Sequence, residues 1–252
     1  SDFSPRSQFK FTSISILYHI TMLKHINQIS EQAFLLDFGS EINIQINKYV
    51  ISFADCILQE IEKDNHLKII NCVPSYNKIL IQFNAFSETK TKIIDFLHSL
   101  NQKEITHVNK KEIVEIPICY DDEFALDIID VSEKTRITKS NIIKLHLNTE
   151  FYVYMIGFMP GLPFMGNLDK QLSVPRKLTP RVHVPAGSVG IVDNLCVIYP
   201  NQSPGGWNII GRTPQRMFDK NKKNPTFVNA GYSVKFKSIS KKQFGKMNKN
   251  NE

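Results

Sequence analysis

The sequence predicts an α+β protein of two domains, a small split βαβ domain followed by a β-barrel. Three observations predict this fold class. Strand and helix periods alternate up to residue 120, the pattern is helical over residues 121–150, and short strand-like runs separated by turns follow. A chain of 252 residues with 42% hydrophobic content is long enough to bury a core in each domain.

The N-terminal domain is expected over residues 22–120. Its helices are predicted from apolar residues at helical spacing over Ile46–Ile61 and Glu88–Leu100, the second with Ser87 as N-cap. Its strands are predicted at Ala33–Phe38, Lys68–Val73, Lys78–Phe83 and Lys111–Cys119. The order strand, helix, strand, strand, helix, strand is that of a split βαβ sandwich, which is also called ferredoxin-like.

A helical connector is expected over residues 121–150 and the barrel over residues 151–240. The connector should hold one short helix near Glu123–Val131 and another that begins around Thr138, capped by Thr138 or Ser140. Because the following strands are short and closely spaced, closure into a barrel would remove their exposed edges. They are predicted at Phe151–Phe158, Arg181–Val184, Val189–Val192, Leu195–Tyr199, Trp207–Arg212, Thr226–Asn229 and Tyr232–Phe236.

Composition argues against several classes of protein. The net charge of +7 comes from lysines that are spread along the chain and become dense only toward a basic tail, residues 241–252, so nucleic-acid binding is not indicated. The four cysteines form no CxxC pair and the seven histidines no HExxH, so we expect neither a metal site nor a disulfide framework. No apolar run reaches the roughly 20 residues of a membrane span. These features favour a protein of the reducing cytoplasm.

Glycine and proline are concentrated in one window, residues 157–214, here called the turn-rich window. It holds 8 of the 11 glycines and 8 of the 12 prolines, together with the only tryptophan, Trp207. Proline fixes the backbone and glycine frees it, so these loops have tightly defined shapes. Such loops frame a binding site, or they are the turns that any compact β-domain needs.

Three arginines lie in or beside proline-bounded segments of this window. Arg176, Arg181 and Arg212 carry planar guanidinium groups that suit carboxylate recognition, and two that converge would form an anion site. Alternatively, each arginine ties down a loop. Ser188 lies between Gly187 and Gly190, where the backbone N–H groups could approach a ligand closely, but the GxSxG pattern of a nucleophile elbow is absent.

The sequence does not offer a complete catalytic set. His146 is a possible general base, yet it lies in the apolar pattern of a predicted helix, which favours a packed position. Trp207 is a packed aromatic or a platform for a ligand or a partner. Asp169, Asp193 and Asp219 all lie in turn-like contexts and do not form an acid–base couple. Catalytic residues therefore stay unassigned.

Ordered motifs in the turn-rich window resemble a known family. The runs GFMPGLPFMGNLD, VPRKLTPRVHVPAGSVGI and YPNQSPGGWNIIGRTPQRMFD are similar to those of the family of the 5-oxoprolinase B subunit (PxpB) and KipI, called allophanate hydrolase subunit 1 in older usage. The likeness extends over about residues 28–238 and is dense over residues 146–219. Two departures are Leu162, where members often have an aromatic residue, and residues 1–21, an extension or a remnant of expression, because similar chains begin near Met22.

The resemblance implies a fold, an activity and partners. It implies a cyclophilin-like barrel as the second domain, and membership of a cytoplasmic complex that hydrolyses 5-oxoproline to glutamate with ATP. The implied partners are a KipA-like C subunit and a LamB/YcsF-like A subunit, with ATP used by the complex and none assigned to this chain. Two alternatives stay open, namely a KipI-like inhibitor of a sensor histidine kinase and the carboxyltransferase half-domain of a urea carboxylase-like system.

The family motifs also imply positions that face a small carboxylate ligand. The substrate-binding set is Arg176, Arg181, Ser188, Tyr199, Ser203, Trp207, Arg212 and His146. Residues that shape the loops around this set are Gly157, Pro160, Gly161, Pro185, Gly187, Pro204 and Gly205. The resemblance assigns no individual role to any of them, and no metal ligand.

Overall fold

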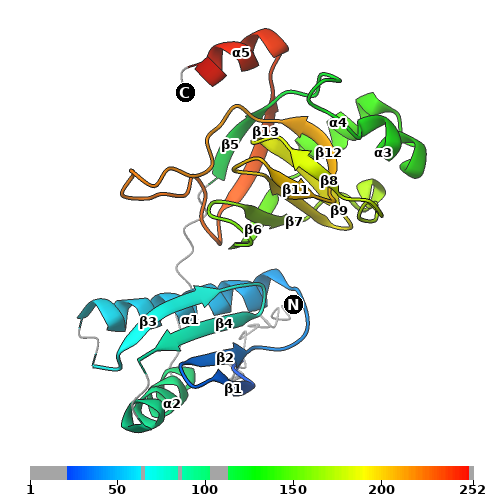
Figure 1. Cartoon of the computed structure of the whole chain (residues 1–252). Coiled ribbons are helices and arrows are strands. Elements are labelled where there is room, and N and C mark those ends of the chain that lie inside the picture. The colour runs from blue at the N-terminus through cyan, green and yellow to red at the C-terminus, as the bar shows by residue number, and fades with distance from the viewer. Residues whose placement is uncertain (1–21, 64–65, 85–86, 103–112, 250–252) are drawn as a thin grey trace, which may run out of the picture.

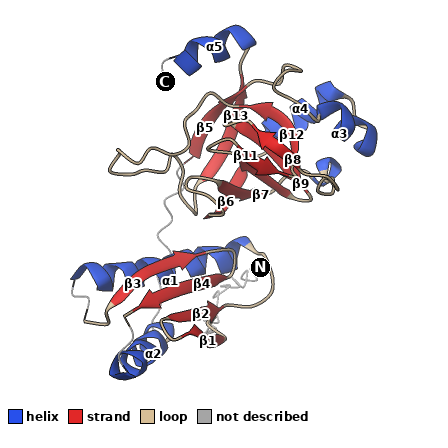
Figure 2. Cartoon of the chain, in the orientation of Figure 1, coloured by secondary structure: helices blue, strands red, loops and turns tan. Residues whose placement is uncertain are grey.

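The chain folds into two lobes, each with its own sheet and core (Figure 1). The computed structural model describes residues 22–63, 66–84, 87–102 and 113–249. One lobe is a four-stranded antiparallel sheet with two helices, and the other is a seven-stranded, barrel-like sheet (Figure 2). The predicted α+β class is confirmed. Within the described ranges, no helix combines the length and the hydropathy that crossing a bilayer requires.

The N-terminal lobe has the strand order β1-β2-β4-β3. Its elements are β1 (His25–Ser30), β2 (Ala33–Asp37), α1 (Ile44–Lys63), β3 (Ile69–Pro74), β4 (Lys78–Phe83) and α2 (Ser87–Asn101). Both helices pack on the same face of the sheet. Alternate residues along β2 and β4 point to this face, and they share one buried cluster with residues of the two helices. This cluster includes Phe34, Leu36, Ile79 and Ile81 from the sheet, and Val50, Phe53, Ile93 and Leu97 from the helices.

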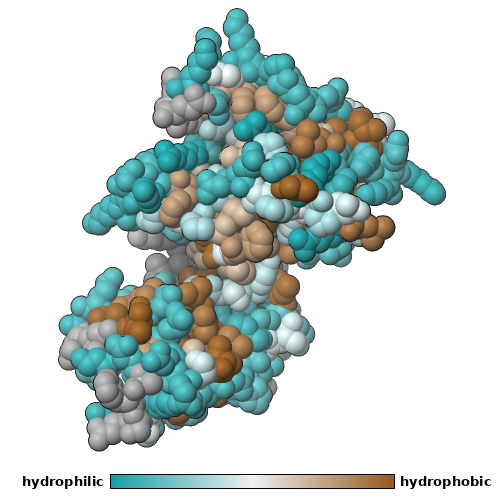
Figure 3. Space-filling view, in the orientation of Figure 1, coloured by the Kyte–Doolittle hydropathy of each residue, from teal (hydrophilic) through white to brown (hydrophobic). Residues whose placement is uncertain are grey.

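The opposite face of this sheet is partly apolar. Leu35, Leu80 and Val73 are cross-strand neighbours on β2, β4 and β3, and each keeps part of its surface exposed. Figure 3 shows hydrophobic residues gathered on the visible side of this lobe, where Figure 1 draws these strands. The period of two along each strand therefore separates a helix-covered face from a more open one.

One predicted strand belongs to a different sheet than expected. Residues Ile113–Ile118 do form a strand, β5, but it pairs in parallel with β13 (Ser233–Ser238) in the barrel. Its Ile116 and Ile118 are fully buried in the barrel core. The place beside β2 in the N-terminal sheet is taken by β1, which the sequence did not predict because most of its side chains are exposed and show no alternation.

The connector contains two helices, α3 (Ile128–Thr135) and α4 (Lys139–Asn148). The second begins as predicted, with the Thr138 hydroxyl accepting a hydrogen bond from the Asn141 N–H at 3.4 Å. The first begins later than predicted, because the N–H groups of Phe124 and Ala125 bond back to Asp121 O and form turns. This shift places Asp127 at the N-terminal end of α3.

The barrel has the strand order β12-β9-β10-β7-β6-β13-β5. Two hydrogen bonds between Cys119 and Arg212, of 2.8 and 3.0 Å, connect the end of β5 to β12 and nearly close the sheet. The remaining strands of this sheet are β6 (Phe151–Ile156), β7 (Pro163–Gly166), β9 (Ser188–Val192), β10 (Leu195–Ile198) and β12 (Asn208–Arg212).

A two-stranded ribbon and a short helix accompany the barrel. β8 (Arg181–Val184) and β11 (Ser203–Gly205) pair only with each other, and a 3-10 turn, η1, spans Lys170–Leu172. The strand predicted at Thr226–Asn229 is wrong, since Thr226 makes a single bridge to Phe218. The predicted basic tail contains a helix, α5 (Lys241–Lys249), whose buried Phe244 stacks on Phe124 with ring centroids 4.4 Å apart.

The two lobes are joined by a buried asparagine of α1. Asn47 Nδ2 lies 2.9 Å from the carbonyl oxygens of Ser75 and Tyr76 and 3.1 Å from that of Tyr154, on β6. Its Oδ1 accepts a hydrogen bond of 3.0 Å from the Tyr152 hydroxyl. Because one fully buried side chain serves acceptors and a donor of both lobes, its loss leaves polar groups unsatisfied on both sides of the junction.

Replacing Asn47 with Ala should lower the free energy of unfolding by about 1–3 kcal/mol, because the three carbonyl groups lose the side-chain donor that Asn47 supplies. Urea unfolding followed by circular dichroism measures this change. The matched control is Gln45→Ala, an exposed position of the same helix, which should change stability by less than about 0.5 kcal/mol. Equal effects of the two substitutions would show that the junction does not depend on Asn47.

Candidate functional site

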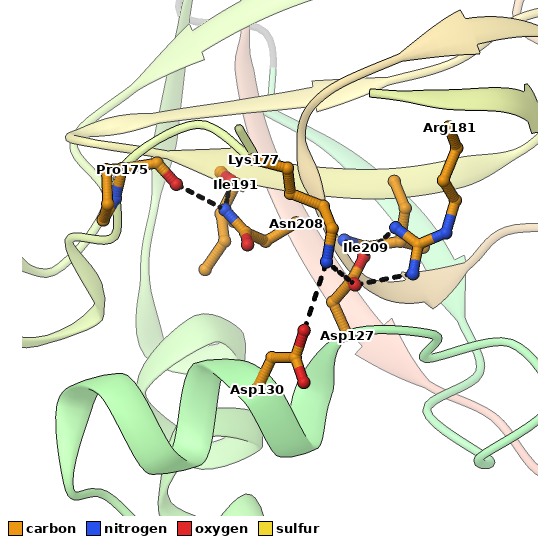
Figure 4. A network of polar contacts seen from close by, with 8 residues as sticks. All are labelled: Asp127, Asp130, Pro175, Lys177, Arg181, Ile191, Asn208 and Ile209. Atoms are coloured by element: carbon orange, nitrogen blue, oxygen red, sulfur yellow. Dashed lines mark hydrogen bonds and ion pairs between the residues drawn. The ribbon is translucent and has the colours of Figure 1, made fainter. Parts of the chain in front are cut away.

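A buried carboxylate organises the edge of the turn-rich window. Asp127 Oδ1 and Oδ2 each lie 2.6 Å from a terminal nitrogen of the Arg181 guanidinium, and Lys177 Nζ lies 2.6 Å from Oδ1 (Figure 4). The Ile209 N–H donates to Oδ2 at 2.8 Å, and Asp130 adds a second carboxylate 3.1 Å from Lys177 Nζ. These residues, here called the Asp127 network, join α3, β8, β12 and the loop before β8.

The network is electrostatically balanced. Burial by itself would raise the pKa of Asp127, but hydrogen bonds from Arg181, Lys177 and the Ile209 N–H outweigh burial and lower it. The bond to Asp127 raises the pKa of Lys177, although burial opposes the rise. Both shifts favour the charged forms, so a carboxylate with no exposed side-chain surface stays ionised at neutral pH.

Sequence reasoning missed Asp127 because it placed the residue inside a helix of the connector and compared only the aspartates of the turns. Lys177 was missed as well. The sequence does contain a feature that could have indicated Asp127, because this residue is the one charged residue in the apolar run Ala125–Ile129. A carboxylate surrounded by buried apolar residues needs a cationic partner, and two cations stand 50 and 54 residues further along the chain.

The three predicted arginines lie in three different environments. The guanidinium of Arg181 is occupied by Asp127, which is the structure expected of a loop brace. Arg176 is exposed, and its side chain runs along Gly206, where an added Cβ would lie 2.8 Å from Nε. Arg212 is half-buried near the barrel seam. The three arginines therefore differ both in their exposure to solvent and in their partners.

Trp207 and Tyr199 belong to a second, smaller core. The Trp207 ring lies edge-on to Phe164 with centroids 6.0 Å apart, and the Tyr199 ring packs so closely on Gly205 that any side chain there would meet its hydroxyl. Burial raises the pKa of Tyr199, and the nearby charge of Arg176 opposes this rise. The buried members of this core are Leu162, Val184, Val197, Tyr199 and Ile209.

Ser188 and Gly187 lie beside Arg212. Ser188 is buried on β9 and is the cross-strand partner of Arg212, while Gly187 has φ +80°, and a Cβ there would meet the Thr213 carbonyl. Both backbone N–H groups already have acceptors within the protein, since Gly187 N donates to Tyr199 O at 2.7 Å and Ser188 N to Pro185 O at 3.2 Å. This arrangement does not favour the prediction that they serve a ligand.

His146 occupies the barrel core. It has no exposed surface, its Nδ1 lies 2.7 Å from the Tyr120 hydroxyl, and its Nε2 lies 3.7 Å from Cys196 Sγ. Burial lowers the pKa of His146 to about 3, so the ring is neutral at physiological pH. The structure thus contains the packed alternative, because the His146 ring is enclosed by the barrel core and has no surface that a ligand could contact.

The remaining predicted residues shape loops. Ser203 Oγ, on β11, donates to the Pro204 carbonyl at 3.2 Å, Gly161 has φ +84°, and Gly157 N donates to Leu162 O at 3.1 Å. Pro160 and Pro185 lie in the turns that precede β7 and β9. No group of three or more metal-binding side chains comes together within the residues that the structure describes.

The fold and the site together define a two-domain protein whose barrel carries arginines on loops of defined shape. The titratable groups of the barrel interior, Asp127, His146 and Cys196, are buried away from solvent. The chain belongs to the family of the carboxyltransferase domain, subdomain C and D, whose model matches residues 24–228. The family membership predicted from the motifs of the turn-rich window is thereby confirmed.

Several relatives show how widely this family extends. The chain is 35% identical over 239 residues to the B subunit of 5-oxoprolinase from Bacillus subtilis (strain 168), covering 89% of this chain and 97% of that protein. It is 35% identical over 212 residues to the B subunit of 5-oxoprolinase from Haemophilus influenzae, covering 84% and 96%. The urea amidolyase of Saccharomyces cerevisiae is 22% identical over 251 residues, and the match covers 87% of this chain and 13% of that protein.

Solved structures share the same fold. TTHA0988 superposes with a TM-score of 0.72 at 26% identity, covering 82% of this chain and 40% of that one, so the present chain spans two fifths of TTHA0988. The conserved uncharacterized protein PH0987 from Pyrococcus horikoshii gives a TM-score of 0.52 at 35% identity, covering 87% of this chain and all of that one. The same two-domain unit thus occurs alone and as part of a longer chain.

Replacing Asp127 with Asn should lower the free energy of unfolding by about 3–5 kcal/mol, because Arg181 and Lys177 would keep their charges without a buried carboxylate. Asp130→Asn is the matched control. Its carboxylate is about half exposed, so we expect a loss of at most about 1 kcal/mol. Urea unfolding at pH 7 measures both changes, and a loss at Asp127 no larger than at Asp130 would contradict the role given to the network.

Acidification should destabilise the protein partly through His146. Its folded pKa is about 3 and lies below the unfolded value of about 6.5, so the unfolded state binds more protons between these two values. At about 1.4 kcal/mol per pH unit, this residue should cost about 2 kcal/mol at pH 5 relative to pH 7.5.

The measurement is urea unfolding of the wild type and of His146→Gln over the pH range from 7.5 to 5. Gln keeps a polar, neutral side chain beside Tyr120 but cannot gain a proton, so its stability should depend less on pH. Parallel pH profiles for the two proteins would mean that His146 does not titrate on unfolding.

Proposed function

We propose that this chain is the B subunit of a cytoplasmic, ATP-dependent 5-oxoprolinase-like complex, which converts 5-oxoproline to glutamate only when its partner subunits are present. The observation that carries this proposal is the likeness to the B subunits of two bacterial 5-oxoprolinases along 97% and 96% of their lengths. Such a match includes both lobes, so it is more specific than a shared barrel.

The side chains of this chain favour a protein that needs completion by others. Asp127 is neutralised by two cations, and His146 is buried and neutral, so neither is available as an acid or base for a substrate. Cys196 also lies in the core, where burial raises the pKa of its thiol and keeps it in its unreactive protonated form. The state of these three groups supports the proposal that partner subunits supply the nucleophile and the acid–base groups of the reaction.

The partners in this proposal are the C subunit, which is KipA-like, and the A subunit, which is LamB/YcsF-like. ATP is bound at the level of the complex, because the sequence contains no glycine-rich phosphate loop that opens a helix. The face of the turn-rich window that carries the exposed Arg176 and the half-buried Trp207 meets a partner and completes the active surface. Trp and Arg are the residue types that contribute most energy to protein interfaces.

A second candidate function is the carboxyltransferase half of a urea carboxylase-like system. The observation in its favour is the match to a urea amidolyase, although this chain covers 13% of that protein at 22% identity. A KipI-like inhibitor of a sensor histidine kinase is the third possibility. Affinity purification from the native cell separates the three, because the copurifying protein would be a C subunit, a biotin-dependent carboxylase or a kinase.

The purified chain alone should show no ATP-dependent hydrolysis of 5-oxoproline, and turnover should appear when the A and C subunits are added. Glutamate and ADP released from the three-component mixture measure this, with each two-component mixture as a control. Trp207→Ala tests the interface, and it should reduce turnover more when the C subunit is limiting than when it is in excess.

Two results would count against this function. Turnover by the purified single chain that is lost in Trp207→Ala or Arg212→Ala, so that a contaminant is excluded as its source, would contradict the need for partners. Absence of turnover from the complete mixture, with the three proteins shown to associate, would reject 5-oxoproline as the substrate.

A further inference from the structure

A cavity lies next to the seam of the barrel. Its volume is about 240 Å³, and its walls include Ala186, Gly187, Pro200, Arg212, Arg216 and Asn248, the last of which belongs to α5. We propose that this space, here called the Arg212 cavity, binds a small monocarboxylate through the guanidinium of Arg212. Such binding requires no partner protein, so it goes beyond the proposed role in a complex.

The charge of Arg212 is not compensated inside the protein. No carboxylate among the described residues forms an ion pair with this half-buried side chain, whereas Arg181, at similar burial, is paired with Asp127. Burial accordingly lowers the pKa of Arg212 with no acidic group to oppose the shift. A buried cation without a counter-charge destabilises a fold, and an anion in the adjacent cavity would remove that cost.

The guanidinium is held in a fixed plane. Nε donates to the Ala186 carbonyl at 2.7 Å, and Cζ lies 5.7 Å from the centre of the Phe244 ring of α5. Within the described part of the chain, the two terminal nitrogens of Arg212 make no hydrogen bond. Their N–H groups can therefore donate two parallel hydrogen bonds to the two oxygens of one carboxylate. The side chain is already ordered, so binding loses little of its conformational entropy.

The cavity suits a monocarboxylate better than a phosphate. Drug-sized ligands occupy pockets of about 300–1,000 Å³, so this cavity takes a smaller molecule. One half-buried cation offsets one negative charge, while a phosphate monoester carries about −1.5 to −2 at pH 7. Pro200 and Pro214 supply apolar wall for a short carbon skeleton. Arg216, the other cation of the walls, is exposed and lies 3.9 Å from the Asp219 carboxylate, which offsets its charge.

The test is titration of the full chain with acetate, 5-oxoproline and inorganic phosphate at constant ionic strength, followed by the NMR signals of arginine Nε–H groups. Both carboxylates should shift the Arg212 signal with saturation, and phosphate should bind more weakly. Arg212→Gln should weaken carboxylate binding about 10- to 100-fold, the usual contribution of charge-assisted hydrogen bonds. Arg136→Gln, an exposed arginine at the end of α3, is the matched control and should bind like the wild type.

A second measurement needs no substitution and therefore does not depend on the folding of a variant. Phenylglyoxal modifies accessible arginines, and peptide mass spectrometry reads the rate at each position. Acetate and 5-oxoproline should slow the modification of Arg212 and leave that of Arg136 unchanged, while chloride at the same ionic strength should protect neither.

Three results would overturn the proposal. In the first, neither carboxylate shifts the NMR signal of Arg212 or slows its modification in the wild type. In the second, Arg212→Gln binds carboxylate with a dissociation constant within twofold of the wild-type value. In the third, the wild type binds phosphate more tightly than carboxylate. A loss of binding in Arg176→Gln instead of Arg212→Gln would move the anion site to the turn-rich window's exposed face. Because each readout uses the single chain, these outcomes are distinguishable from failure of the complex to turn over.

Discussion

The arrangement of the barrel's loops depends on one buried carboxylate. Asp127 connects the start of α3 to Arg181 of β8, to Lys177 in the preceding loop and to the backbone of β12. The β8–β11 ribbon is not part of the barrel sheet, so side-chain contacts and the small core beneath it determine its position. A residue outside the turn-rich window thus fixes the position of its β8 loop against the barrel, while prolines and glycines give each loop its local shape.

The same dependence explains what the sequence could predict about the fold. Short apolar runs bounded by turns identified β2, β4 and β9, and a hydroxyl before an apolar run identified the cap of α4 at Thr138, because both signals act within a few residues. The alternation of β5 showed that it is a strand but could not show its partner, which lies more than a hundred residues away. The sequence of β1 shows no alternation of apolar and polar residues, because this edge strand is mostly exposed and buries neither of its faces.

The limits are sharper for the site. Arg176, Arg181 and Arg212 look alike in sequence, each within two residues of a proline, yet one is exposed, one is paired with a carboxylate, and one is half-buried without a carboxylate partner among the described residues. Pairing and burial are tertiary properties that local sequence does not encode. The motifs nevertheless identified the family correctly, because they record the shapes of loops, and loop shape follows from local backbone chemistry.

The position of β13 has a consequence for how the barrel is made. This strand lies between β5 and β6 in the sheet, although it follows both in the chain by a wide margin. During synthesis, β5 through β12 leave the ribosome with a gap where β13 belongs, and β5 is otherwise linked to the sheet only at its end, by the bridge from Cys119 to Arg212 among the described residues. The barrel is therefore an open sheet with unpaired edges until Ser238 has emerged, and its assembly waits for the last of its own strands.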